Sequence, residues 1–251
     1  MAARQKLRIL CFGDSLTAGY SAMGSVYHPY EKMLVQMLEM AFPDMDVETV
    51  EDGKPGCTVK FAYLDRIQEN FPPKKKDAEP FDWVIVLGGT NDLAIGVPPE
   101  SVFEKLREVW DFALRRKCKV LALTVPEAGG FRKRTEPPRI KLNDLIKGYK
   151  RTGFHVFDLF AAVPFQSMSA QDKERYWDDG LHFTPDGYDL IGNKIGIMLV
   201  SVLAREKAEN DPVPSRRRRF FRDDEKVFDE EDDDPGSLNK GYIVVRRRDL
   251  D

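Results

Sequence analysis

Apolar residues along the chain alternate between short continuous runs and longer stretches in which they recur every three or four positions. Residues 7–12 and 82–87 are the clearest runs of strand length, and the second fits a central strand covered on both faces. Shorter runs follow at 47–50, 119–125 and 155–160. Strands that alternate with helices predict βαβ units, a parallel sheet and right-handed crossovers.

The stretches with helical spacing lie between these predicted strands or after the last of them. They cover residues 29–41, 61–67, 98–114, 142–149 and 185–202. Proline stands at the start of three of them, where the first turn of a helix tolerates its missing N–H. The segments 21–28, 71–80 and 126–138 are expected to be loops, and 165–173 is expected to be irregular.

Three segments with polar residues begin where predicted strands end, at 13–15, 55–58 and 88–92. Because the carboxyl ends of parallel strands meet at one edge of a sheet, we expect these segments to lie close together. Gly13 lets the backbone turn sharply after the first strand, so that Ser15 is presented at this edge as a nucleophile would be.

A fourth segment, 177–182, reads Trp-Asp-Asp-Gly-Leu-His. An aspartate three residues before a histidine offers a general base and the carboxylate that orients it on one local turn. These are the two partners that a serine nucleophile requires.

The four segments, in this order, resemble the sequence blocks of the GDSL esterases within the SGNH hydrolase superfamily. The resemblance spans roughly the first two hundred residues, which is about one large domain. It implies a flavodoxin-like three-layer α/β/α sandwich with a five-stranded parallel sheet in the order 2-1-3-4-5. It also implies a carboxylic ester hydrolase that works through an acyl-serine intermediate and needs no cofactor or metal.

Ser15 is the nucleophile that this resemblance implies, and its hydroxyl needs a base within hydrogen-bond reach. The chain has three histidines. His28 stands in a predicted loop and His155 opens a predicted strand, so both are interpreted as structural or surface residues. His182 lies in the segment that resembles the D-x-x-H block of the family and is predicted to be the base.

Asp179 and Asp178 are chemically identical neighbours, and spacing alone allows either to orient the histidine. The family resemblance selects Asp179. It further implies three oxyanion-hole donors, which are the backbone N–H of Ser15, the backbone N–H of Gly56 and the side-chain amide of Asn91.

Asp14 and Asp92 stand beside these candidates and are interpreted as structural, bracing loops through bonds to backbone N–H groups. A phosphatase would instead use Asp14 as its nucleophile. That alternative fails on spacing, because Leu16 stands where a second acid is expected, and no acidic cluster for magnesium is evident.

Composition excludes several other classes of protein. A chain of 251 residues that is 42% hydrophobic can bury a substantial core as one domain. Its net charge of −3 argues against nucleic-acid binding. Neither an apolar signal region nor an apolar segment of membrane length is predicted. Cys11, Cys57 and Cys118 lack metal-ligand spacing, so a reduced, cytoplasmic setting is expected.

The character of the chain changes after Ala204, where blocks of like charge occur at 216–219, 229–234 and 246–248. We therefore predict a hydrolase domain over 1–204 and a charged, disordered extension over 205–251. The predicted partner is a small-molecule ester, and the extension is a candidate contact for a protein partner. The alternative function is a non-catalytic interaction protein that works through this extension.

Overall fold

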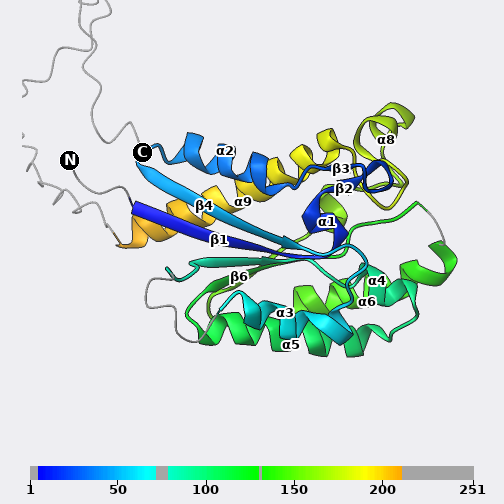
Figure 1. Cartoon of the computed structure of the whole chain (residues 1–251), viewed down its shortest axis with the longest axis horizontal. Coiled ribbons are helices and arrows are strands. Elements are labelled where there is room, and N and C mark those ends of the chain that lie inside the picture. The colour runs from blue at the N-terminus through cyan, green and yellow to red at the C-terminus, as the bar shows by residue number, and fades with distance from the viewer. Residues whose placement is uncertain (1–4, 72–78, 130–131, 211–251) are drawn as a thin grey trace, which may run out of the picture. The chain divides into compact units, whose positions relative to one another are not determined.

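A five-stranded parallel sheet forms the centre of the computed structural model, which describes residues 5–71, 79–129 and 132–210 (Figure 1). Its strands are β1 (Gln5–Gly13), β4 (Met45–Gly53), β5 (Trp83–Val86), β6 (Lys119–Leu123) and β7 (Phe154–Phe157). They lie in the order β4-β1-β5-β6-β7, and every neighbouring pair is parallel. This confirms the predicted α/β class and the strand order 2-1-3-4-5.

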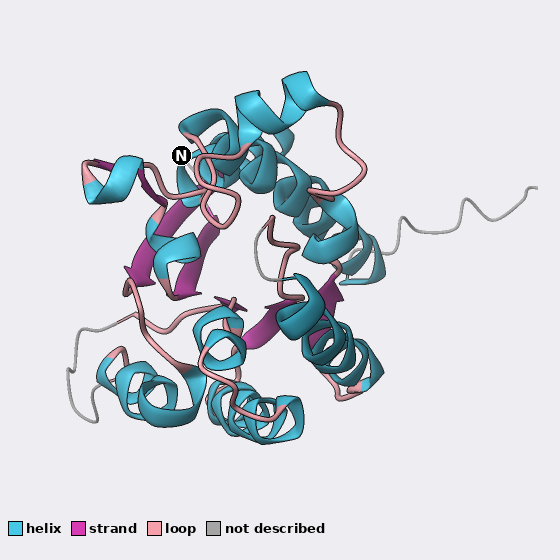
Figure 2. Cartoon of the chain, turned by 90° about the vertical axis from the view of Figure 1, so that its right-hand side faces the viewer, coloured by secondary structure: helices cyan, strands magenta, loops and turns pink. Residues whose placement is uncertain are grey.

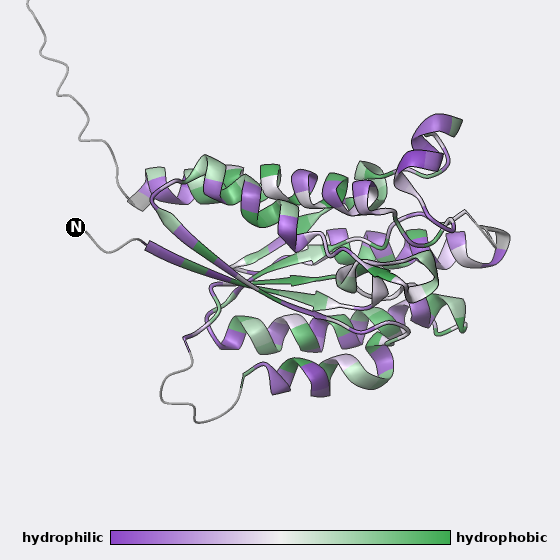
Figure 3. Ribbon diagram, turned by 45° about the horizontal axis from the view of Figure 1, so that its top comes forward, coloured by the Kyte–Doolittle hydropathy of each residue, from purple (hydrophilic) through white to green (hydrophobic). Residues whose placement is uncertain are grey.

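Helices cover both faces of this sheet (Figures 1 and 2). On one face lie α2 (Glu31–Ala41) and α9 (Pro185–Asn210), and on the other lie α3 (Leu64–Glu69), α5 (Pro99–Arg115) and α6 (Arg132–Gly148). The inner strands β5 and β6 are mostly hydrophobic, whereas β4, the beginning of β1 and the helices alternate between hydrophobic and hydrophilic residues (Figure 3). Such helices bury one face against the sheet and leave the other to solvent.

The alternation of side chains along β1 assigns its residues to two separate cores. Ile9 and Cys11 pack in the core formed with α2 and α9, while Leu10 and Phe12 pack in the core formed with α5 and α6. This period of two is the geometry of a strand buried on both faces. Two cores therefore hold β1 in register and fix the position of the turn that follows it.

Short elements follow the strands at their carboxyl ends. They are α1 (Ser15–Ala18), the hairpin of β2 (Tyr20–Ser21) and β3 (Val26–Tyr27) around η1 (Ala22–Gly24), η2 (Val59–Tyr63), α4 (Thr90–Ala94), α7 (Leu159–Ala162) and α8 (Ala170–Tyr176). Figure 2 turns this end of the sheet towards the viewer.

Three predicted loops differ from the structure. The loop expected at 126–138 is wrong in its second half, because α6 begins at Arg132 and contains Pro137 and Pro138. The irregular segment 165–173 ends early, since α8 begins at Ala170. The segment 21–28 contains most of the β2–β3 hairpin. Of the predicted connection 71–80, residues 72–78 lie outside the described residues.

Helix α9 is long and apolar enough over Pro185–Glu209 to cross a membrane, by length and composition alone. The expectation that no segment of membrane length exists is therefore wrong. The apolar residues Tyr188, Ile191, Ile195 and Leu199 of this helix are fully buried in the core it forms with α2 and the sheet. Packing in that core explains why the helix is so apolar.

The chain divides into two units, Met1–Glu206 and Lys207–Asp251. Of the second unit, the structure describes only residues 207–210, the end of α9. The predicted extension 205–251 thus falls for the most part outside the described residues, and its boundary at 204 stays a prediction.

Candidate active site

The turn between β1 and α1 presents Ser15 at the carboxyl edge of the sheet. Asp14 caps α1 by accepting a hydrogen bond from the Leu16 N–H through Oδ1 at 3.0 Å. Gly13 has no room for a side chain, since a Cβ there would lie 2.7 Å from the backbone oxygen of Leu87. Glycine is thus required by close packing, which supports the sharp turn inferred from the sequence.

Ser15 and His182 come together from opposite ends of the chain. The Oγ of Ser15 lies 3.0 Å from Nε2 of His182. The other ring nitrogen, Nδ1, lies 2.8 Å from Oδ2 of Asp179. A carboxylate on Nδ1 favours the tautomer with its proton there, which leaves Nε2 free to accept the proton of the serine.

Asp179 is held for this role by its own backbone surroundings. Its Oδ1 accepts hydrogen bonds from the N–H groups of His182 at 2.7 Å and Leu181 at 2.9 Å. Partial burial raises the pKa of Asp179, but the hydrogen bonds from His182 and these backbone groups outweigh it, so the pKa lies below its usual value. Asp179 is therefore favoured as a carboxylate.

Asp178 points elsewhere, because its Oδ2 accepts a hydrogen bond from the Ala22 N–H at 2.7 Å. The choice that spacing left open between the two aspartates is thus decided geometrically in favour of Asp179 as the partner of His182. The other two histidines also have partners of their own. His28 bonds Asp189 at 2.7 Å, and the ring of His155 lies 5.1 Å from that of Trp83.

The loop that carries His182 is anchored by aromatic packing. Trp177 and Phe183 form an isolated antiparallel bridge, and their ring centroids are 4.0 Å apart. Within the loop, the N–H of Gly129 donates to the carbonyl of Gly180 at 2.6 Å, which ties it to the segment after β6. The ring of Tyr20 lies 4.6 Å from that of His182. The imidazole is therefore confined from several sides.

The candidate oxyanion donors belong to two segments that contact each other. Asn91 lies on α4, and its Nδ2 donates to the Cys57 carbonyl at 2.9 Å, next to Gly56 in the chain. One of the two amide hydrogens of Asn91 is thereby used and the second remains. Gly56 has a φ of +75°, and a Cβ there would meet nothing within 4 Å.

The loop of Gly56 is also fixed to the turn of Ser15. The N–H of Lys54 donates to the Gly13 carbonyl at 3.1 Å, and Gly53 packs against the backbone of Ala18. Within the described part of the chain, the N–H groups of Ser15 and Gly56 have no hydrogen-bond acceptor. Unpaired donors of this kind are what an oxyanion hole offers to a substrate.

Comparison with known families identifies the family of this chain. A model of the GDSL-like lipase/acylhydrolase family matches residues 11–190, which includes every candidate residue. The chain belongs to this family. A comparison with curated proteins found no match.

Solved structures with the same fold include members of this GDSL family. A lipase/acylhydrolase from Enterococcus faecalis is 24% identical with a TM-score of 0.61, and the match covers 78% of this chain and 96% of that one. A lipolytic G-D-S-L protein from Veillonella parvula is 21% identical with a TM-score of 0.58, and the match covers 75% of this chain and 95% of that one. A variant of an acetyl-xylooligosaccharide esterase from Geobacillus is 17% identical with a TM-score of 0.57, and the match covers 78% of this chain and 94% of that one. At these identities the likeness shows the fold alone.

Two buried aspartates brace the site of this GDSL-family chain. Asp92 accepts hydrogen bonds from the N–H groups of Val59 at 2.8 Å and Lys60 at 2.9 Å. Together with the cap that Asp14 forms, this confirms the prediction that both side chains bind backbone N–H groups. Burial raises the pKa of Asp14 to about 7 and also raises the pKa of Asp92. The described residues contain no group of three or more His, Cys, Asp or Glu side chains that could hold a metal ion.

Sequence reasoning named Asp178 but not its bond to the hairpin, and it missed two residues that contact this GDSL site. They are Tyr20 beside His182 and Arg66, whose Nη1 donates to the Gly13 carbonyl at 2.9 Å. Neither shows a local pattern that marks a role. Their contacts join segments far apart in the chain, which spacing along the sequence cannot indicate.

Proposed function

We propose that this protein is a serine esterase that hydrolyses carboxylic esters through an acyl-serine intermediate. The single observation that carries the proposal is the continuous chain of hydrogen bonds from Ser15 through His182 to Asp179. A serine, a base and an orienting carboxylate in this order form the constellation that activates a serine nucleophile. Membership of the GDSL family supports the class of reaction.

In the proposed reaction, Oγ of Ser15 attacks the ester carbonyl while Nε2 of His182 takes its proton. The imidazolium is stabilised by Asp179 and then gives this proton to the leaving alcohol. Water, deprotonated by the same histidine, attacks the acyl-serine and releases the acid. His182 gives the proton taken from this water to Oγ of Ser15 as the acid leaves, so both halves balance without a cofactor.

Negative charge develops on the carbonyl oxygen during each attack. We assign its stabilisation to the backbone N–H groups of Ser15 and Gly56 and to the second amide hydrogen of Asn91. Two features support the assignment: the backbone donors lack acceptors, and the loop of Gly56 is bonded both to Asn91 and to the turn of Ser15.

Covalent labelling with a fluorophosphonate probe tests the proposal, with Ser15→Ala as the control. We expect labelling of the wild-type protein at Ser15 and none of the variant. A panel of esters graded in acyl length, together with acetylated sugars, then identifies the substrate class. The acetylated sugars are included because one protein of the same fold carries that activity in its name. A folded wild-type protein that neither labels nor hydrolyses any ester contradicts the proposal.

The alternative of a non-catalytic interaction protein depends on residues 205–251, of which 211–251 lie outside the described residues. No contact of the described residues favours it over the esterase. The cytoplasmic setting, the small-molecule ester partner and a protein partner for the extension stay predictions.

A further inference from the structure

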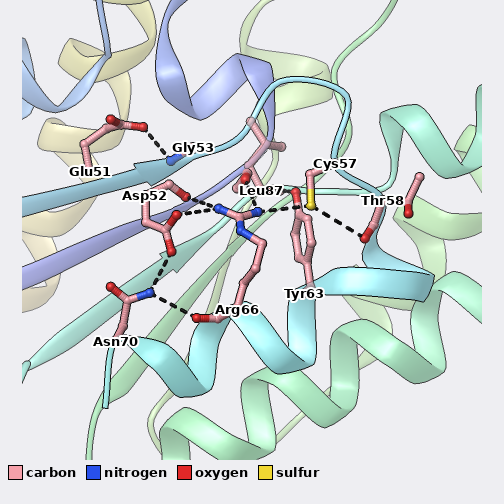
Figure 4. Close-up of polar contacts among 10 residues, drawn as sticks. Glu51, Asp52, Gly53, Cys57, Thr58, Tyr63, Arg66, Asn70 and Leu87 are labelled. Carbon is pink, nitrogen blue, oxygen red and sulfur yellow. Dashed lines mark hydrogen bonds and ion pairs between the residues drawn. The ribbon is translucent and has the colours of Figure 1, made fainter. Parts of the chain in front are cut away.

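Arg66 is a largely buried cation that contacts the segments on either side of two candidate oxyanion donors, and Figure 4 shows its polar contacts. It belongs to α3, and its side chain is only 11% exposed. The guanidinium extends to the carboxyl ends of β1 and β4, the two strands that precede the turn of Ser15 and the loop of Gly56. A buried cation is costly unless its donors are paired, and the donors of Arg66 are paired with backbone and side-chain acceptors.

The two terminal nitrogens of Arg66 serve two different segments. Nη1 donates to the Gly13 carbonyl at 2.9 Å, two residues before Ser15, and also lies 3.2 Å from Sγ of Cys57. Nη2 donates to the carbonyl of Asp52 at 2.9 Å and to its carboxylate. One planar group thus joins the nucleophile turn to both ends of the loop that contains Gly56.

Other side chains fix the orientation of this guanidinium. Asn70, one turn further along the chain, donates through Nδ2 to Oδ2 of Asp52 at 2.6 Å and so holds the carboxylate in place. The rings of Phe12 and Tyr63 lie 4.8 Å and 5.6 Å from the guanidinium carbon. Figure 4 shows the guanidinium bounded by Asp52, Cys57 and the Tyr63 ring. Stacking and bidentate pairing are the interactions that favour arginine over lysine.

We propose that Arg66 is a positioning residue that sets the distance between the backbone N–H donors of Ser15 and Gly56. The proposal rests on the proposed esterase function. Ser15 N–H is fixed relative to the Gly13 carbonyl by the turn, and Gly56 N–H relative to Asp52 and Cys57 by the loop. Because Arg66 bonds both segments through one rigid fork, its loss lets the two donors move apart. The N–H groups of Ser15 and Gly56 then have to be reoriented while negative charge develops on the carbonyl oxygen of the substrate. The energy of this reorientation adds to the barrier of the reaction.

Arg8, on β1, offers a matched control. Its side chain is 15% exposed, pairs with Glu48 at 3.0 Å and lies with its guanidinium carbon 4.8 Å from the ring of Phe81. It therefore resembles Arg66 in burial, in ion pairing and in its aromatic contact. Arg8 lies near the start of β1, however, far along the strand from Ser15. If replacing an arginine lowers activity only by destabilising the fold, the methionine variants of Arg66 and Arg8 should lose activity alike.

Steady-state kinetics on p-nitrophenyl acetate with Arg66→Met, Arg66→Lys and Arg8→Met test the proposal. We expect Arg66→Met to lower kcat by roughly 10²-fold with KM changed less than about threefold, because the donors meet charge mainly in the transition state. Arg66→Lys keeps the charge but not the fork, so it should recover only a minor part of kcat. Arg8→Met should lose thermal stability and keep kcat.

Hydrogen exchange of the backbone amides provides a readout that needs no turnover. The amides to follow are those of Lys54 and Cys57 in the loop and of Leu16 in the turn of Ser15, because their N–H groups are hydrogen-bonded. Faster exchange at these amides in Arg66→Met, without the same change in Arg8→Met, supports the proposal. Normal kcat in a folded Arg66→Met, or equal losses of kcat in both methionine variants, overturns it. If the wild-type protein hydrolyses no ester, the esterase proposal fails, while unchanged exchange in Arg66→Met refutes the positioning role separately.

Discussion

The carboxylate of Asp178 accepts a hydrogen bond from the backbone N–H of Ala22 at 2.7 Å, across 156 positions of the chain. This bond ties the β2–β3 hairpin to the loop that carries His182. Ala22 and Met23 have φ values of 47° and 53°, a left-handed conformation that residues other than glycine rarely adopt. The same hairpin presents Tyr20, whose ring contacts His182. Asp178 thus stabilises a strained turn that borders the proposed base.

Asp178→Ala should therefore loosen the hairpin and lower kcat/KM by about tenfold, which corresponds to the loss of one charge-assisted hydrogen bond. Asp178→Asn is the control, because its amide oxygen still accepts the bond from Ala22. We expect it to retain most of the activity. Equal losses in the two variants would show that the charge of Asp178 matters and not its bond to the hairpin.

Ser15→Ala and His182→Ala should each lower kcat by roughly 10⁴-fold with the fold unchanged. Both side chains serve the same proton transfer across the 3.0 Å contact, so the double variant should be little worse than either single one. Steady-state kinetics with a soluble ester, together with circular dichroism of each variant, measure this. Near-normal turnover by Ser15→Ala rules out the acyl-serine mechanism.

Asn91→Ala should cost on the order of 10²–10³ in kcat with a smaller change in KM. The variant removes the proposed third donor and also the 2.9 Å bond to the Cys57 carbonyl that holds the loop of Gly56. Separate measurement of kcat and KM decides the role. A loss that appears only as a raised KM would make Asn91 a residue of substrate binding.

The buried carboxyl of Asp14 should make stability depend on pH. Burial raises its folded-state pKa from 3.8 to about 7, so the folded protein binds more protons than the unfolded chain between these values. The free energy of unfolding therefore falls as pH rises from about 4 to about 7, and the stabilisation by the neutral acid is fully present only below this window.

Asp14→Asn removes this titration while its amide oxygen still caps the Leu16 N–H. Between about pH 5 and pH 8, we expect the wild-type protein to lose on the order of 2–3 kcal/mol more than the variant. Denaturant unfolding at several pH values measures the difference. Parallel profiles of the two proteins would mean that Asp14 is already ionised at pH 5 in the folded state.

The parts of the fold that the sequence predicted are those with strong local periodicity. The run at 82–87 contains β5, which is buried along its whole length, and the spacing after Pro98 marks α5. Helix α6 was recognised only from residue 142, because Pro137 and Pro138 disfavour a helix. They stand in its first two turns, and the burial of Leu142 and Ile146 beyond them outweighs the backbone bonds that the prolines cannot form.

The candidate site likewise contains some residues that local sequence patterns identify and others that only the structure reveals. Ser15, His182 and the candidate donors stand in short local patterns, so sequence reasoning could name them. Arg66 could not be named, because its contacts with Gly13 and Asp52 lie 53 and 14 positions away and depend on how α3 packs against two strands. The aspartate pair shows an intermediate case, because spacing reduced the choice to Asp178 or Asp179. In the structure, the contact of Asp179 with His182 and that of Asp178 with Ala22 separate them.

A protein truncated after Asn210 should fold cooperatively and hydrolyse a small soluble ester at close to the full-length rate. Every residue of the proposed site precedes that point, and the buried face of α9 ends at Leu199. Truncation after Ala204 is the sharper comparison, because it also removes Glu206, which pairs with Lys119 on β6. Both side chains are partly exposed, so this loss should cost about 1 kcal/mol or less and leave kcat unchanged. Thermal unfolding and kcat of the two truncations measure this, and loss of turnover after truncation at Asn210 would place residues 211–251 in the fold or in the site.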